Sequence, residues 1–199
     1  MTADSTIRFY DANAPTFFAA TVDVDLTPLY QRFLSHTPTG SHILDAGCGS
    51  GRDTAFFHAH GYRVSAFDAS PQLAALAAAH TGLPVQVLRF EDMTWYQTFD
   101  AVWACASLLH LSPQRLPDVM HRLHTALKPD GVLYASFKYG HGEAVTDGRY
   151  FYSLDEQALT DLLIDAPRFS VLDTWTTSDQ RPNRSHERWL NTLLRALRD

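Results

Sequence analysis

The sequence predicts an α/β fold in which a mostly parallel sheet carries helices on both faces. Short runs rich in Val, Ile, Leu and aromatic residues alternate with longer segments whose apolar residues recur at helical spacing. Strands that alternate with helices form parallel sheets that are covered on both sides. The chain has 199 residues, of which 45% are hydrophobic and 19% charged. This size and composition suit a single globular domain with a full core.

Five segments have the length and composition of strands, and the helices between them have recognisable ends. Ser70, which is followed by proline, predicts the start of a helix that ends at Gly82. Ser112, also followed by proline, predicts a second start, and residues 26–34 predict a lead-in helix. The expected strands are 42–46, 63–68, 84–90, 99–106 and 131–138.

The last quarter of the chain is less regular. Residues 153–166 predict a helix capped by Ser153, and residues 168–179 predict a strand. Residues 186–196 fit two structures: their leucines recur at helical spacing, whereas two final antiparallel strands would complete the sheet.

We expect one domain over residues 1–199, because no repeat, low-complexity tract or long linker divides the chain. It has four expected parts: an N-terminal arm or lid (1–25), a ligand-binding core (26–138), a loop at the binding edge (139–152), and a C-terminal helix with strands (153–199).

Bulk properties narrow the classes of function. The net charge of −6 argues against binding to a phosphate backbone, although five arginines near the C-terminus predict either a solvated rim or a local docking patch. Cys48 and Cys105 form no disulfide framework or metal-binding pattern, so we expect no metal site. There is no signal-peptide pattern and no run of ~20 apolar residues, which predicts a cytoplasmic protein without a membrane span. The arginines are Arg181, Arg184, Arg188, Arg195 and Arg198.

The stretch HILDAGCGSGRD, residues 42–53, predicts a ligand-binding loop. Glycines after a strand let the chain turn sharply and let a ligand approach the backbone. A dinucleotide site has the pattern G-x-G-x-x-G, but here the third glycine comes early, at Gly51, and Arg52 stands in its place. No Gly-Lys-Ser/Thr follows, so the loop is not a P-loop either.

Acidic residues close the first three predicted strands. Asp45 lies at the mouth of the glycine loop, where a carboxylate disfavours pyrophosphate but suits an ammonium group. Asp68, at the end of the second strand, is placed to accept hydrogen bonds from both hydroxyls of a ribose. Glu91 and Asp92 follow the third strand, where they accept from an adenine amino group or remain solvated carboxylates of a plain turn. A ligand with a ribose, an amine and an adenine but no phosphates fits this set, and S-adenosyl-L-methionine (SAM) is such a ligand.

The motifs occur in the order found in a known family. The segments ILDAGCGSGRD, VSAFDAS, FEDM, FDAVWACASLLHL and LKPDGVLYASFK resemble those of the class I SAM-dependent methyltransferases, over roughly residues 26–138. The resemblance implies a Rossmann-like, doubly wound, seven-stranded sheet whose last strand is antiparallel. It therefore favours a strand over residues 186–196.

The resemblance also implies which residues contact SAM. Asp45, Gly47 and Gly49 would line its methionine part, Asp68 would hold the ribose, and Asp92 would approach the adenine. The full set of cofactor contacts that we expect is Asp45, Ala46, Gly47, Cys48, Gly49, Arg52, Asp68, Ala69, Glu91, Asp92, Met93 and Ala104.

Residues outside these motifs are expected to bind the methyl acceptor. His110, just beyond the fourth strand, is the candidate general base, or else it packs or caps the turn that follows. The aromatic N-terminal segment around Tyr10 either forms a lid or packs an arm against the domain. Lys138, Glu143 and Arg149 line an acceptor pocket or belong to a solvated hairpin; a pocket with this lysine and arginine suits an anionic group.

Three functions remain open from the sequence. A methyltransferase acting on a small molecule, with S-adenosyl-L-homocysteine (SAH) as product, is the first. A tRNA or protein methyltransferase is the second, and a SAM-binding regulatory subunit without catalysis is the third. A DNA amino-methyltransferase is not expected, because no Pro-Pro-aromatic motif follows the fourth strand. The oligomeric state does not follow from the sequence.

Overall fold

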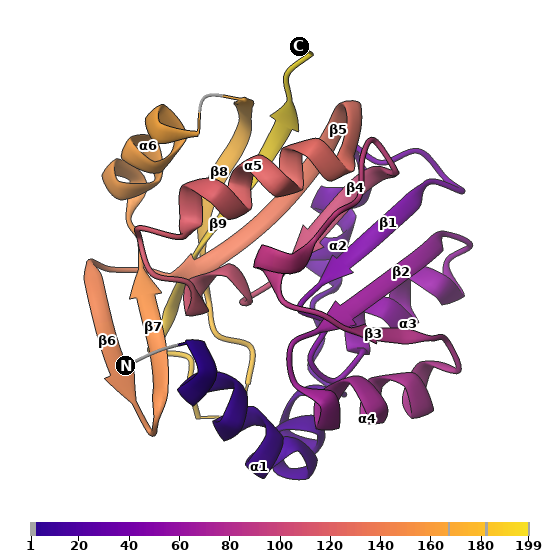
Figure 1. The fold of residues 1–199 in the computed structure, drawn as a ribbon, viewed down its shortest axis with the longest axis vertical. Coiled ribbons are helices and arrows are strands. Elements are labelled where there is room, and N and C mark those ends of the chain that lie inside the picture. Colours follow the sequence, from indigo (N-terminus) through magenta and orange to yellow (C-terminus); the bar gives the residue numbers. More distant parts are fainter. Residues whose placement is uncertain (1–2, 167, 182, 199) are drawn as a thin grey trace.

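A seven-stranded sheet forms the centre of the computed structural model (Figure 1), which describes residues 3–166, 168–181 and 183–198. The strand order is β3-β2-β1-β4-β5-β9-β8. All neighbouring pairs are parallel except β5–β9 and β8–β9, so β9 alone runs against the others. The predicted fold class and its antiparallel last strand are confirmed. The strands are β1 (His42–Ala46), β2 (Arg63–Asp68), β3 (Val85–Val87), β4 (Phe99–Ala104), β5 (Leu127–Lys138), β8 (Phe169–Ser178) and β9 (Arg188–Ala196).

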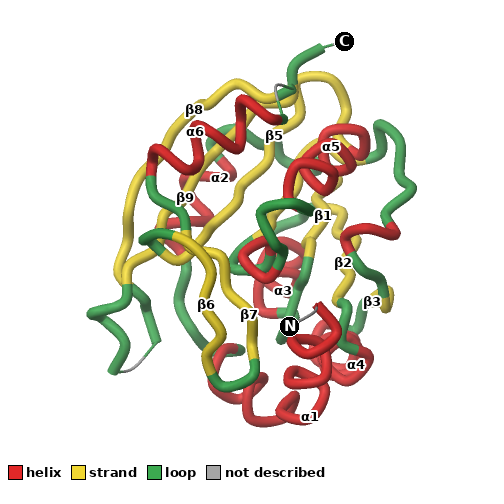
Figure 2. The backbone as a smooth tube through the Cα atoms, turned by 60° about the vertical axis from the view of Figure 1, so that its left-hand side comes forward, coloured by secondary structure: helices red, strands yellow, loops and turns green. Residues whose placement is uncertain are grey.

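Helices cover both faces of the sheet, as Figures 1 and 2 show. Alternate side chains of β1 pack against the two opposite helix layers, because successive strand residues point to opposite faces of the sheet. Ile43 packs into the core beneath α2 and α3, whereas Leu44 packs into the core beneath α5 and α6. The helices are α1 (Ala3–Thr21), α2 (Thr27–Leu34), α3 (Arg52–Ala59), α4 (Pro71–Thr81), α5 (Leu116–Ala126) and α6 (Glu156–Asp165). Two short 3₁₀ turns, η1 (Phe90–Asp92) and η2 (Leu108–His110), follow β3 and β4.

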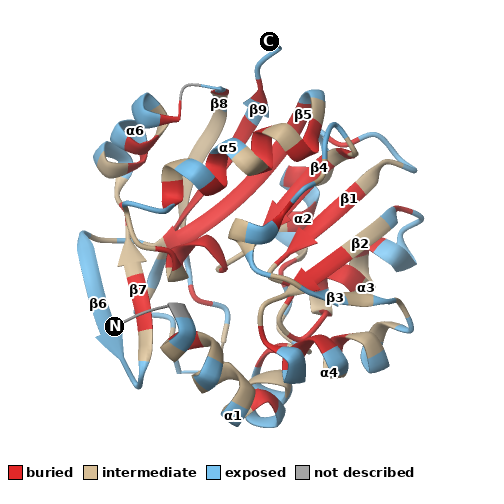
Figure 3. Cartoon of the chain, viewed as in Figure 1, coloured by how far each residue is buried: buried red, intermediate tan, exposed pale blue. Residues whose placement is uncertain are grey.

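The ambiguous segment over residues 186–196 forms a strand, β9, although its leucines recur at helical spacing. β9 lies between β5 and β8, and Leu190, Leu193 and Leu194 are fully buried. Figure 3 shows the buried centre of the sheet. A strand that is buried on both faces has no need of polar alternation, so its leucines can match helical spacing by chance.

Several predicted element ends need correction. Ser70 does cap α4, where its hydroxyl accepts a hydrogen bond from Leu73 N. Ser112, by contrast, precedes a turn, and α5 begins only at Leu116. The cap of α6 is Asp155 rather than Ser153, because the Asp155 carboxylate accepts from the backbone of the first helical turn.

The segment predicted as a loop over 139–152 is a β-hairpin, β6 (Gly142–Thr146) and β7 (Arg149–Ser153). β6 is exposed throughout, whereas β7 is partly buried and contacts α1. The Tyr150 backbone N–H donates to Thr6 Oγ1 across this contact, at 3.0 Å. Hairpin and N-terminal helix thus lie together at one edge of the sheet (Figure 1). Among the described residues, no helix has the length and apolar character needed to cross a membrane.

Candidate active site

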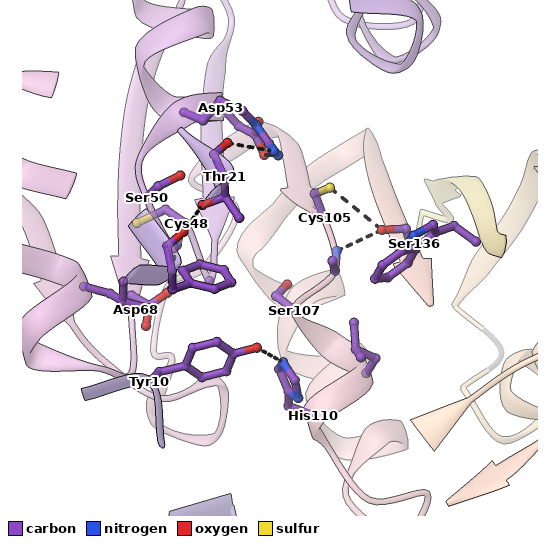
Figure 4. A pocket seen from close by; sticks show the side chains of 18 of the residues that line it. Tyr10, Thr21, Cys48, Ser50, Asp53, Asp68, Cys105, Ser107, His110 and Ser136 are labelled. Carbon is purple, nitrogen blue, oxygen red and sulfur yellow. Dashed lines mark hydrogen bonds and ion pairs between the residues drawn. The ribbon is translucent and has the colours of Figure 1, made fainter. Parts of the chain in front are cut away.

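A cavity of about 320 Å³ opens where β1, β2, β4 and β5 end (Figure 4). Ligands bind at this edge in doubly wound sheets, because the loops that leave neighbouring strands diverge there. The glycine loop and Asp68 form one wall, and His110 lies on the opposite wall. Residues of α1, among them Tyr10 and Phe17, also line the cavity.

Close packing between two loops explains the first glycine. Gly47 has φ +78°, and a Cβ added there would lie 2.6 Å from the Cβ of Ser107, which follows β4. The Ser107 hydroxyl in turn donates to the Ala46 carbonyl at 2.7 Å. Only glycine meets both requirements, so the turn after β1 is held against the turn after β4.

The amides of the glycine loop are bonded within the protein. β1 and β2 end level, since Ala46 pairs with Phe67, and the Phe67 carbonyl accepts from both Gly47 N and Cys48 N at 2.9 Å. Gly49 N donates to Asp68 Oδ2, also at 2.9 Å. A phosphate-binding loop needs several free amides that point at the ligand. These three are not free, so the loop is unsuited to a pyrophosphate.

Asp68 is both a support of the loop and a wall of the cavity. One carboxylate oxygen accepts from Gly49 N and the other from Ser70 N, each at 2.9 Å. Burial raises the pKa of Asp68, against the opposing effect of these backbone donors. A carboxylate oxygen has more than one lone pair, so each can also accept from a ribose hydroxyl. Asp68 lines the cavity, and its contact with a ribose stays a prediction.

Asp45 lies beneath the cavity and is not among the residues that line it. Its side chain is buried, and Thr54 donates to one of its oxygens at 2.6 Å. Burial, with the nearby Asp53 carboxylate as the next cause, raises the pKa of Asp45 to about 8. The group is therefore mostly a neutral carboxylic acid at pH 7, and its predicted contact with SAM stays a prediction.

A buried cluster next to it fixes a cation on the cavity wall. Arg52 lines the cavity and forms a two-pronged ion pair with Asp53, with Nε 2.6 Å from Oδ1. Tyr30 and Trp103 also donate to the Asp53 carboxylate. Burial pushes the pKa of Asp53 upward, but Arg52 and these donors outweigh it and the pKa falls below its usual value. Asp53 thus holds Arg52 in place, where its free N–H groups suit a carboxylate ligand.

The predicted adenine contacts divide between the cavity and the rest of the domain. Ala69 and Glu91 line the cavity, although Glu91 also pairs with Arg115 at 2.7 Å. Asp92 is exposed and Met93 is buried in the core, and neither lines the cavity. Their contacts with the adenine stay predictions, as does the cofactor contact expected of Ala104, which is buried in β4. Apolar lining that the sequence reasoning missed comes from Leu88, Phe90, Phe67 and Leu73.

His110 has a defined tautomer. Its Nδ1 lies 2.7 Å from the Tyr150 carbonyl, which only accepts, so Nδ1 carries the proton. Nε2 then has the lone pair and accepts from the Tyr10 hydroxyl at 2.9 Å (Figure 4). Burial lowers the pKa of His110 to about 4, with Arg149 and Lys138 adding to the effect, and burial raises the pKa of Tyr10. The pair is therefore a neutral imidazole and a protonated phenol at pH 7.

Cations gather at the end of the cavity beyond His110. Lys138, Arg149, Arg181 and Arg184 line it there, and Lys138 pairs with Glu187 at 3.0 Å. Glu143, predicted to contact the acceptor, instead lies exposed on β6 outside the cavity and accepts from the Tyr150 hydroxyl. That contact stays a prediction.

The five C-terminal arginines do not act as one group. Arg181 and Arg184 face the cavity. Arg188 lies over the Tyr139 ring, Arg195 is exposed on β9, and Arg198 pairs with Asp130. A single docking patch or solvated rim therefore does not describe them, and only their positions in the fold separate the two sets.

The strand order and the antiparallel strand β9 are those of the Rossmann-like fold of class I SAM-dependent methyltransferases. Comparisons with known proteins agree. Residues 43–131 match the family described as "Methyltransferase domain". The match covers less than half of the chain and includes the glycine loop, Asp68 and the turn after β4.

Individual relatives cover parts of the chain. An uncharacterized methyltransferase of Staphylococcus carnosus is 29% identical over 135 residues, 64% of this chain and 65% of that protein. A ubiquinone biosynthesis O-methyltransferase of Xanthomonas axonopodis pv. citri is 33% identical over 109 residues, 50% of this chain and 44% of that protein. The chain thus spans less than two thirds of the length of these curated relatives.

A solved structure matches almost the whole chain. It is the Burkholderia thailandensis 1,6-didemethyltoxoflavin-N1-methyltransferase with bound 1,6-didemethyltoxoflavin and SAH, with a TM-score of 0.83 and 24% identity. The match covers 98% of this chain and 89% of that one. At this identity the likeness establishes the fold and leaves the acceptor to be argued from the site.

Proposed function

We propose that the protein transfers the methyl group of SAM to a nucleophilic atom of a small-molecule acceptor and releases SAH. One observation carries the proposal: a single cavity has a nucleoside grip without phosphate-binding amides at one end and the Tyr10–His110 pair at the other. The family match over residues 43–131 supports it. SAM supplies a methyl group on a positively charged sulfur, whose bond to carbon is already activated for displacement.

The residues of the cavity fit SAM part by part. Asp68 accepts from the ribose hydroxyls, and Arg52 holds the carboxylate of the amino-acid part. Leu88 and Phe90 offer the adenine an apolar surface. Phe17 of α1 covers the loop, since a Cβ added at Gly49 would lie 3.2 Å from its ring. No part of the ligand then requires a free loop amide, which agrees with the internal bonding of that loop.

The Tyr10–His110 pair accepts the proton that a neutral acceptor must lose. As the acceptor atom bonds to the methyl carbon, its proton passes to the Tyr10 oxygen and the Tyr10 proton passes to His110 Nε2. The Tyr150 carbonyl keeps the ring oriented through Nδ1 and stabilises the imidazolium that forms. General-base catalysis of this kind contributes ~10²–10⁴-fold, and positioning of the acceptor contributes the larger share.

The cavity favours a small molecule over a macromolecule. α1 and the β6–β7 hairpin lie over its mouth, and the C-terminal arginines are divided between the cavity and the outer surface. The names of the relatives agree, since one is a ubiquinone biosynthesis O-methyltransferase and another is a toxoflavin-type N-methyltransferase. Both cysteines are free, which supports the cytoplasm as the compartment.

Calorimetry with SAM and SAH, followed by transfer of labelled methyl to a host extract, tests the proposal. The extract is separated into small molecules, RNA and protein before counting. We expect SAM and SAH to bind, and label to enter the small-molecule fraction. Label in RNA or protein would favour the macromolecular alternative, and tight SAM binding without transfer to any fraction would favour a regulatory subunit.

A further inference from the structure

From the geometry of the cavity we infer that the methyl acceptor carries an anionic group, a carboxylate or a phosphate, and that Arg149 binds it. This inference rests on the proposed function and names its acceptor class. Arg149 then determines specificity, because it contacts the part of the acceptor that does not react.

Arg149 is held in place but is left with little to bind. Its side chain is only 14% exposed, and its guanidinium lies 4.7 Å from the centre of the Phe9 ring and 5.2 Å from that of Phe151. Its ion pair to Asp147 is long at 3.5 Å, and the Asp147 side chain is 71% exposed. Among the residues that the structure describes, Arg149 Nε is buried without a hydrogen-bond partner.

A buried guanidinium with an unpartnered N–H is costly unless a ligand completes it. Aromatic rings can stabilise the charge of Arg149, but they do not satisfy its N–H groups. The planar fork of arginine matches the two oxygens of a carboxylate or phosphate. The arrangement is thus that of an anion receptor whose partner comes from outside the chain.

The charged residues around Arg149 also favour an anionic ligand. Lys138, Arg149, Arg181 and Arg184 line this end of the cavity, and Asp179 is the only carboxylate among the described residues that lines it with them. Glu187, outside the lining, pairs with Lys138 at 3.0 Å and with Arg184 at 3.2 Å, so the ion pair of Arg149 is the longest of the four. Asp179 is bonded to Arg181 and to Trp189 Nε1, so it already has its partners. Lys138 and Arg149 lie 4.7 Å and 5.2 Å from the centre of the same Phe151 ring, so both positive charges are held around this one ring. An anion would relieve their repulsion.

The carboxylate of SAM does not account for Arg149. Arg52 lies beside the glycine loop, and Arg89, which also lines the cavity, is paired with Asp4. Arg149 instead lies on β7 with the His110 side of the cavity. The charge of Arg149 acts on both Tyr10 and His110, and a side-chain hydrogen bond from Arg149 also opposes the larger effect of burial on the pKa of Tyr10. An anion on Arg149 would therefore lie next to the proton-accepting pair rather than next to the loop.

An anionic acceptor would also assist the chemistry. Burial is the main reason that the pKa of His110 is low, and the charges of Arg149 and Lys138 lower it further. A bound anion neutralises those charges and raises the basicity of His110. The acceptor would then help to prepare the base that removes its own proton.

Fluorine NMR with the SAH-saturated protein tests the inference. The probes are 4-fluorobenzoate, 4-fluorophenyl phosphate and the neutral 4-fluorobenzamide, which separate carboxylate, phosphate and ring binding. We expect at least one anionic probe to bind at least tenfold more tightly than the amide. Arg149→Met should reduce that binding by roughly 10- to 100-fold, the range for a lost charge-assisted hydrogen bond, with SAH affinity within twofold of the parent. Arg195→Met, at an exposed position of β9, is the matched control and should change neither the binding of the anionic probe nor the affinity for SAH.

Three outcomes would overturn the inference: equal binding of the amide, binding of neither anion, or an Arg149→Met variant that keeps anion binding. A loss of SAH affinity in Arg149→Met would assign this arginine to SAM instead. Retention of labelled product on an anion exchanger is the second measurement. Label only in neutral or cationic products refutes the anionic acceptor but leaves methyl transfer intact, whereas no label in any product refutes the proposed function itself.

Discussion

The Tyr10 hydroxyl lies 2.9 Å from Nε2 of His110, a residue 100 positions further along the chain. This hydrogen bond joins the N-terminal helix α1 to the turn after β4. It occupies the one lone pair of the imidazole, because Nδ1 donates to the Tyr150 carbonyl. Helix α1 thus contributes a hydroxyl group to the cavity as well as apolar side chains.

We expect Tyr10→Phe and His110→Ala each to lower kcat by ~10²–10⁴-fold with little change in SAM affinity, because each breaks the same proton path. The double variant should lose no more than the His110→Ala single variant, since the two residues act as a unit. Labelled methyl transfer and calorimetry measure both quantities. Tyr96→Phe, at an exposed tyrosine, is the control. Full activity in Tyr10→Phe would remove the hydroxyl from the path.

The pH profile follows from the environment of His110. Its pKa is lowered to about 4, and the base must be unprotonated to act, so protonation stops the reaction only at low pH. We therefore expect kcat/KM to stay nearly level as the pH falls from 8 to 5, rather than to decline near 6.5, the ordinary value for histidine. An acid limb centred near 6.5 that disappears in a His110 variant would contradict a buried, neutral imidazole.

Asp68→Ala should weaken SAM binding by roughly 10- to 100-fold, because two hydroxyls lose a charged acceptor and the loop loses the bond to Gly49 N. Asp68→Asn keeps one oxygen acceptor, so its affinity for SAM should lie between those of Asp68→Ala and the parent. Calorimetry measures the affinities, and Asp118→Ala, on the exposed surface of α5, is the control. Equal affinity in Asp68→Ala and the parent would exclude Asp68 from the site.

Gly47→Ala should lower the free energy of unfolding by about 2–4 kcal/mol, because the new Cβ meets Ser107 and the backbone keeps a positive φ. Gly82→Ala is the matched control. It has φ +69°, but its Cβ would meet nothing within 4 Å, so only the backbone cost of about 1 kcal/mol remains. Urea unfolding measures both, and equal losses would show that the contact with Ser107 is unimportant.

Asp45 should make the protein less stable as the pH rises. Its pKa is about 8 in the folded chain and near 3.8 when unfolded, so between these values the folded state binds the extra proton. The free energy of unfolding then falls with pH by up to ~1.4 kcal/mol per pH unit from this group, and the effect ends above pH 8. Urea unfolding of the parent and Asp45→Asn between pH 5.5 and 8.5 measures it. We expect the amide to flatten the slope, and an unchanged slope would mean that Asp45 is ionised.

The fold could be predicted because its signals are local. A serine and a proline before a helix, or an apolar run between glycines, identify an element without reference to the rest of the chain. β9 could not be assigned in this way, because its central residues are buried on both faces, so apolar and polar residues do not alternate along it. The helix predicted from Ser112 does form, but it begins only at Leu116, because the serine and proline precede a turn rather than the helix itself.

The two ends of the candidate site also differ in how far the sequence could predict them. The glycine loop and Asp68 belong to adjacent strands with fixed register, so their meeting follows from the motif order. The bond of Tyr10 to His110 and the position of Arg181 depend on how α1 and the β8–β9 connection pack, which no local pattern encodes. The burial of Asp45 was missed because a strand-end carboxylate looks the same in sequence whether it faces a ligand or lies beneath it.

The internally bonded glycine loop also bears on selectivity among metabolites. ATP, NAD and coenzyme A all present an adenosine, and each bears phosphates next to its ribose. Here those phosphates would meet backbone donors already engaged with Phe67 and Asp68, and a carboxylate of their own sign. A site of this kind disfavours ATP, NAD and coenzyme A because it offers their phosphates no free hydrogen-bond donors. An inhibitor that shares the adenosine group should accordingly be neutral or cationic at its 5′ position.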